Sequence, residues 1–315
     1  MSEFYYGGQA VIEGVMMRGQ RRVAIAVRNP EGQIVVHEES LPEKVYRSRW
    51  SKMPFLRGLV LLWDALILGT KALMWSADVA IGEDEEEAQG FSGPVAWGAV
   101  AISLIVGVAI FFLLPTGVAH LSENYLGLSK YASAVLEGFF RLFLFIAYLA
   151  LIARSEEIRR VFMYHGAEHK TINAYEAGET MTPENVARYS TRHTRCGTSF
   201  LLFVVLISIV LFIPLQFDVW WVRLLSRLVL IPVVSGISYE VLRVSTRYQN
   251  HFLMRAVIWP GLAMQSLTTR EPTLDMLEVA IHALIPVLVA DGLETPPLAE
   301  PASNPAGAPS PAPAQ

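Results

Sequence analysis

Hydrophobic and polar positions divide the chain into an alternating N-terminal part, several long apolar runs and a polar central segment. In the N-terminal part, Val23, Ile25 and Val27 are separated by smaller or charged residues. Alternation with a period of two is typical of strands, and Asn29-Pro30-Glu31-Gly32 has the composition of a turn. We therefore predict a small antiparallel β-meander with strands at 9–17, 22–28 and 33–39.

Four apolar runs are candidates for membrane-spanning helices. The first, 93–118, contains no charged residue, and about 20 helical residues suffice to cross a hydrocarbon core of about 30 Å. A kink is expected near Pro232, because proline removes a backbone donor from a helix. We predict a mainly α, polytopic helical membrane protein with spans at 93–118, 132–153, 199–217 and 222–241.

Two charged residues interrupt the second apolar run. Glu137 and Arg141 stand four positions apart, so they share one face of a helix and can form an ion pair there. Charges inside a membrane are candidates for function, but a couple that neutralises itself also serves structure. We favour the structural interpretation.

A different pattern occupies residues 55–78, where Arg57, Asp64, Lys71 and Asp78 recur every seven residues. Seven residues make nearly two helical turns, so these charges form one narrow stripe on an otherwise apolar helix. An interfacial amphipathic helix fits this pattern best, and a spanning helix inside the bundle is the alternative. The predicted organisation is a cytoplasmic β-meander at 1–54, this helix and an acidic linker at 55–92, a four-span domain at 93–241, membrane-associated helices at 242–293 and a disordered Pro/Ala tail at 294–315.

Composition and charge support a membrane protein. The chain is 53% hydrophobic and 17% charged, and its net charge of −4 gives no sign of nucleic-acid binding. Ten Lys or Arg residues precede the first span and seven lie between the second and third, whereas the loop 119–131 has one. By the positive-inside rule we predict a multi-pass protein of the cell membrane, with both termini and the central segment 154–198 cytoplasmic and the lipid bilayer as its main partner.

The central segment contains the strongest candidate for chemistry, a His-x-x-Glu-His array. If residues 155–177 form a helix, His165 and His169 lie on one face and can bind a single ion, with Glu168 beside them as a general base. Glu176 is on the same face but lies roughly 10.5 Å further along a straight helix. It is therefore excluded as a ligand.

A catalytic zinc site usually takes three protein ligands and a water, so two histidines are not enough. Candidates to complete the set are His193, Cys196, Glu13 and Glu240. A cysteine ligand favours zinc, our preferred ion, whereas nitrogen and oxygen ligands leave iron or manganese open. The alternative is that these histidines are solvated side chains near a membrane surface.

Several segments resemble the YqhQ-like family of bacterial membrane proteins of unknown function, whose members are often labelled predicted metal-dependent enzymes. The resemblance covers about residues 5–290 and implies that the array belongs to a site, without a reaction or a ligand set. It rests on Gly7-Gly8-Gln9-Ala10-Val11-Ile12-Glu13-Gly14, Tyr164-His165-Gly166-Ala167-Glu168-His169-Lys170, Arg195-Cys196-Gly197-Thr198-Ser199-Phe200 and Thr268-Thr269-Arg270-Glu271-Pro272.

Three functions are compatible with these patterns. The leading hypothesis is a metal-dependent hydrolase whose site faces the cytoplasm. The second is a non-enzymatic membrane scaffold or assembly factor that binds a membrane-protein partner or a second copy of itself. The third is a transporter with a path lined by Glu137, Arg141 and Arg227, which the lack of a visible internal repeat disfavours.

Overall fold

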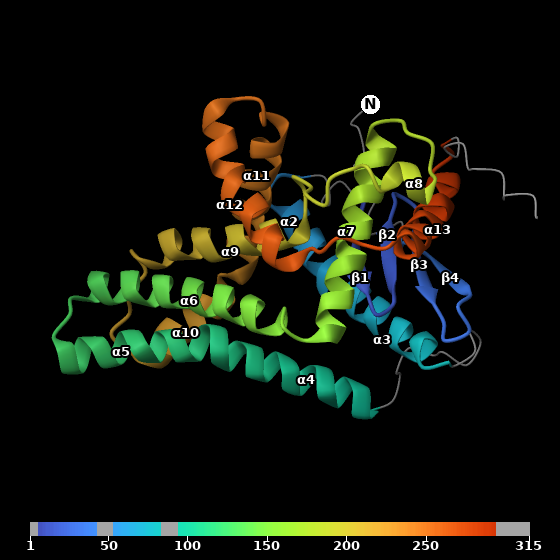
Figure 1. The fold of residues 1–315 in the computed structure, drawn as a ribbon. Coiled ribbons are helices and arrows are strands. Elements are labelled where there is room, and N and C mark those ends of the chain that lie inside the picture. The colour runs from blue at the N-terminus through green and yellow to red at the C-terminus, as the bar shows by residue number, and fades with distance from the viewer. Residues whose placement is uncertain (1–5, 43–52, 83–93, 294–315) are drawn as a thin grey trace, which may run out of the picture.

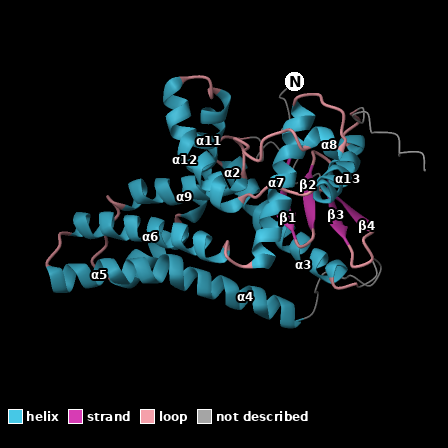
Figure 2. Cartoon of the chain, in the orientation of Figure 1, coloured by secondary structure: helices cyan, strands magenta, loops and turns pink. Residues whose placement is uncertain are grey.

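The computed structural model describes residues 6–42, 53–82 and 94–293, and these residues form a mainly helical protein with one small antiparallel sheet near the N-terminus (Figures 1 and 2). This architecture confirms the predicted fold class. The acidic run at 83–87 and the Pro/Ala tail at 294–315 lie outside the described residues, so their predictions stay untested.

The sheet has four strands rather than the three predicted: β1 (Gly7–Val11), β2 (Gly14–Arg18), β3 (Arg22–Arg28) and β4 (Ile34–Ser40), paired in chain order. The single strand predicted over 9–17 is wrong, because the chain reverses at Ile12 and Glu13. Glu13 has a φ of 50°, the left-handed conformation of a tight turn. Gly14 follows because a Cβ there would lie 2.2 Å from the carbonyl oxygen of Ala26.

Helices cover both faces of the sheet. One face packs against α7 (Glu156–Glu176) and α13 (Leu274–Ala290), and the other packs against α3 (Gly69–Ala80). Alternating side chains therefore enter two different cores, and small alanines on one face let α13 approach closely. The first core includes Val15, Met17, Ala24, Ala26, Tyr164, Leu277 and Leu284, and the second includes Met16, Val23, Ile25, Val27, Ala72, Trp75 and Val79.

The helix predicted over 55–78 is present as α2 (Leu56–Trp63), a π-helical turn η2 (Asp64–Leu68) and α3. Part of its charged stripe faces the protein: Asp64 and Asp78 are buried and Asp64 pairs with Arg18 at 2.8 Å, whereas Lys71 is exposed. The side chains of Trp63 and Leu66 are exposed on the outside. The stripe therefore attaches the helix to the sheet and leaves an apolar surface free, as an interfacial helix requires.

Two helices are long and apolar enough to cross a membrane among the described residues. The first is the continuous 30-residue run Trp97–Leu126, built from α4 (Pro94–Val108), a π-helical turn η3 (Ala109–Leu113) and α5 (Leu114–Leu126). The second is α6 (Lys130–Ile152), with 23 residues. The protein thus has membrane-spanning candidates where the first two apolar runs predicted them.

The third and fourth predicted spans are not single long helices in the structure. The helix α9 (Gly197–Phe212) has only 16 residues and ends just before Pro214, which has no backbone N–H to continue the helical hydrogen bonds. The helices α10 (Trp220–Val229) and α11 (Ile231–Arg247) make a third span only if the pair, bent by 45°, is counted as one. The bend falls at Leu230, next to Pro232, where a kink was expected. The remaining helices are α8 (Pro183–Val186) and α12 (Phe252–Thr268).

The predicted ion pair of Glu137 and Arg141 is present, and a second arginine joins it. Arg141 donates to Glu137 at 2.8 Å, and Arg227 of α10 contacts the same carboxylate at 3.2 Å. All three side chains are buried, and Arg141 also donates to the carbonyl oxygen of Phe111 in η3. Because π-helical turns leave carbonyl groups without helical partners, this arginine also satisfies the backbone of the neighbouring helix.

Candidate metal centre

The His-x-x-Glu-His array lies on α7, which begins after Ser155 and so matches the helix expected over 155–177. Gly166 lets another segment cross the helix, since a Cβ there would lie 2.1 Å from the carbonyl oxygen of Arg270. The amide of Arg270 donates to the carbonyl of Phe162 at 2.9 Å at the same crossing. The glycine therefore brings the end of α12 to the array.

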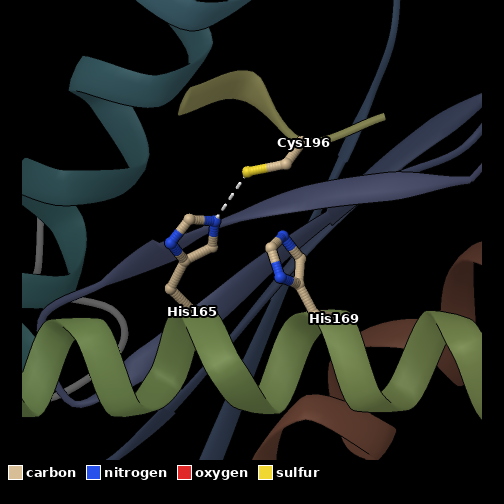
Figure 3. Close-up of side chains that lie close together, drawn as sticks. All are labelled: His165, His169 and Cys196. Carbon is tan, nitrogen blue, oxygen red and sulfur yellow. Dashed lines mark hydrogen bonds between the residues drawn. The ribbon is translucent and has the colours of Figure 1, made fainter. Parts of the chain in front are cut away.

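Three metal-ligating side chains converge above this helix. His165 and His169 point to the same side of α7, and Cys196 approaches them from the start of α9 (Figure 3). One donor atom from each residue lies within 4.8 Å of the others, and the Sγ atom of Cys196 is 3.2 Å from Nε2 of His165. Tetrahedral zinc places nitrogen and sulfur donors roughly 3.3–3.8 Å apart, so this set fits an ion with little movement.

Backbone carbonyls orient both imidazoles. The Nδ1 atom of His165 lies 2.8 Å from the carbonyl oxygen of Thr268, and that of His169 lies 2.6 Å from the carbonyl oxygen of Thr191. A carbonyl only accepts, so each Nδ1 carries a proton, and in the neutral imidazole each Nε2 presents its lone pair. Metal-ligating histidines are typically held this way. Within the described residues, the buried Nε2 of His169 makes no hydrogen bond.

The loop that leads to Cys196 is fixed by buried polar contacts. The side-chain amide of Gln265 accepts from the backbone amide of His193 at 2.9 Å and donates to its carbonyl at 2.8 Å. Asn173 on α7 donates to the carbonyls of Ser190 and Arg192. These contacts hold both ends of the loop, so the thiol is positioned by the fold and not by an ion alone.

Glu168 lies beside the three donors and is fixed by the sheet. Its Oε1 atom accepts from the backbone amide of Gly8 on β1 at 2.9 Å, and its Oε2 atom lies 3.4 Å from Nε2 of His169. Gly8 permits the close approach of β1 and β2, because a Cβ there would lie 2.1 Å from the carbonyl oxygen of Met16. A buried carboxylate is thus held within reach of the imidazoles.

The three donors shift one another's pKa values. Burial alone would raise the pKa of the Cys196 thiol, but the facing imidazoles outweigh it and hold the pKa well below its usual value. Burial lowers the pKa of His169, but the thiolate and Glu168 more than compensate and raise it to about 9. The pKa of His165 is raised for the same reason, chiefly by Cys196. The cluster therefore favours a thiolate with a nearby positive charge.

The other candidate ligands lie outside the three-donor cluster. Nε2 of His193 faces Glu176 at 3.8 Å, although its ring centroid is 5.7 Å from that of His169. Glu13 forms a two-pronged ion pair with Arg160 at 2.6 and 2.5 Å. Glu240 pairs with Arg57 and accepts from the backbone amide of Phe55 at 3.0 Å. Each of these groups has a partner that would compete with an ion.

Reasoning from the sequence missed the groups that hold the ligands. The carbonyls of Thr191 and Thr268 and the amide of Gly8 leave no side-chain signal, because any residue could supply them. Gln265 did leave one, as a polar residue inside the apolar run 252–267 that is completely buried in the structure. Buried polar groups need partners, so its position indicated a structural contact.

Comparison with known proteins identifies the family. The chain is 34% identical over 298 residues to "Uncharacterized protein YqhQ" of Bacillus subtilis (strain 168), which covers 91% of this chain and 93% of that protein. No solved structure matches it. Residues 53–290, which include the His-x-x-Glu-His array and Cys196, match the family described as "Protein of unknown function (DUF1385)". The chain therefore belongs to the DUF1385 family.

Proposed function

We propose that this protein is a metal-dependent membrane enzyme, most plausibly a hydrolase, with its centre at the cytoplasmic face. The observation that carries the proposal is the convergence of His165, His169 and Cys196, with both imidazoles oriented by carbonyls and one buried Nε2 left without a hydrogen bond. Zinc is the preferred ion because the set contains a thiolate. The concentration of arginines in segment 154–198 supports the cytoplasmic placement.

The residues of this chain would have separate roles. His165, His169 and Cys196 would hold the ion through three protein ligands, which leaves a fourth position open as in catalytic zinc sites. The ion would supply Lewis-acid chemistry. Glu168 would accept the proton of an attacking water, because its carboxylate is buried next to the ligands and fixed by Gly8.

The first test is the metal content of the purified full-length protein. We expect about one equivalent of zinc in the wild type and none above background in the double variant His165→Ala with His169→Ala, because a lone thiolate holds zinc poorly. Elemental analysis after gel filtration measures both. The variant Arg188→Gln, which removes an exposed side chain that is not a candidate ligand, serves as the control. Absence of stoichiometric metal from a folded wild type would contradict the proposal.

A second test separates binding from catalysis. Glu168→Gln keeps the shape of the side chain and removes its basicity, so we expect the variant to retain zinc within about tenfold of wild-type affinity while losing roughly 10²–10⁴-fold in turnover. Competition with a zinc chelator measures the affinity. Turnover is followed on a panel of hydrolysable ester, amide and phosphate substrates. Loss of zinc from this variant would make Glu168 a ligand and rule out its role as a base.

A further inference from the structure

The helices α11 and α12 form a hairpin that crosses the direction of the spanning helices α5 and α6 (Figure 1). Within α9, the residues that pack against the hairpin lie in the first three turns, where Phe200 and Phe203 contact Leu242. Gly261 of α12 meets Ser199 at the same end. The hairpin thus joins the bundle at the end that carries Cys196 and extends sideways from it.

The outer surface of this hairpin is apolar and aromatic. Phe252 is 73% exposed, Trp259 is 68% exposed and Tyr248 is 55% exposed. Such side chains are favoured at the boundary between hydrocarbon and headgroups, where the ring is partly desolvated and its polar group reaches water. A hairpin that lies along the membrane surface would place these rings at that boundary.

Beyond Glu240, which pairs with Arg57, the charge of the hairpin has one sign. Between Glu240 and Glu271 the sequence contains four arginines and no aspartate or glutamate. Arg247 and Arg255 are exposed, flank the turn, and make no ion pair with any residue that the structure describes. An exposed basic surface next to interfacial aromatic side chains is complementary to anionic lipid headgroups, to which each arginine can donate bidentate hydrogen bonds.

We propose that the α11–α12 hairpin is an in-plane anchor that binds anionic phospholipid headgroups at the same membrane face as the candidate metal centre. Arg247 and Arg255 bind the phosphates, while Phe252 and Trp259 lie at the level of the headgroups and upper acyl chains. The inference is independent of the metal, because none of these residues contacts the three donors. It assigns a lipid-binding role to a surface that the proposed hydrolase activity does not use.

Hydrogen exchange of the full-length protein in nanodiscs tests this anchor. One nanodisc contains phosphatidylcholine alone, and the other contains phosphatidylcholine mixed with phosphatidylglycerol. We expect the amides at 247–255 to exchange up to roughly thirtyfold more slowly with phosphatidylglycerol. Each of the two arginines near an anionic surface contributes about fivefold, and the two factors multiply. The double variant Arg247→Gln with Arg255→Gln should exchange equally in both lipids.

The control variant is Arg188→Gln, which removes an exposed arginine beside α8 and should keep the full lipid dependence. The amides of β2 and β3 in the centre of the sheet should stay equally protected in all samples, which verifies that the variants fold. Equal exchange of the wild-type hairpin in the two lipids would overturn the proposal. Protection that appears only when a soluble protein is added would also overturn it and assign the surface to a protein partner.

Discussion

Replacement of Glu137 by glutamine is expected to lower the free energy of unfolding by about 3–5 kcal/mol, because it leaves two buried arginines without a counter-charge. The side chains of Arg141 and Arg227 are 5% and 0% exposed, so water cannot replace the lost carboxylate. Glutamine keeps the shape and one acceptor oxygen, which isolates the effect of charge. Equilibrium unfolding in mixed detergent micelles, followed by circular dichroism, measures the change.

Two comparisons make this prediction specific. Lys130 and Asp218 form an exposed pair whose side chains are 50% and 84% exposed, so replacement of Asp218 by asparagine should leave the free energy of unfolding nearly unchanged. The triple variant Glu137→Leu, Arg141→Met and Arg227→Met should recover part of the loss, since a buried network is often replaceable as a whole. If Glu137→Gln had the same free energy of unfolding as the wild type, the two arginines would have to reach water, as a transport path requires.

The fold was largely predictable because its strongest signals are local. Apolar runs identified the first two candidate spanning helices, and alternation identified the sheet. The hairpin at Ile12 and Glu13 was missed because a left-handed glutamate is rare and the β-branched Val11, Ile12 and Val15 favour strands. The length of α9 was overestimated because the uncharged run continues past Pro214, where helical backbone ends. Both errors arise from single backbone positions inside an apolar run.

The candidate site was predictable only in part, for a different reason. Helical spacing determines that His165 and His169 share a face, so this pair followed from the sequence alone. The choice of Cys196 over His193 depends on the path of the loop 187–196, which Gln265 and Asn173 hold through contacts between distant segments. Glu13 and Glu240 offered equally good carboxylates, and their partners Arg160 and Arg57 could not be identified by spacing.

Cobalt substitution provides the sharpest test of the ligand set. We expect the cobalt-loaded wild type to show a thiolate-to-cobalt charge-transfer band, and Cys196→Ser to lose the band together with more than roughly 100-fold of its metal affinity. Removal of a ligand should lower the metal affinity by more than the 10–100-fold that is typical when a group hydrogen-bonded to a ligand is removed. Absorption spectroscopy and chelator competition measure the two effects without knowledge of the substrate.

The alternative ligands supply matched controls for this test. Because Glu13 and Glu240 are held by arginines, Glu13→Gln and Glu240→Gln should keep the band and bind metal within about tenfold of the wild type. His193→Asn should do the same, since its Nε2 atom faces Glu176 and Arg195 instead of the three donors. If Cys196→Ser kept its affinity while one of these controls lost it, the ion would be bound by a different set. The thiol beside His165 would then be free of the ion, and its thiolate would be available as a nucleophile.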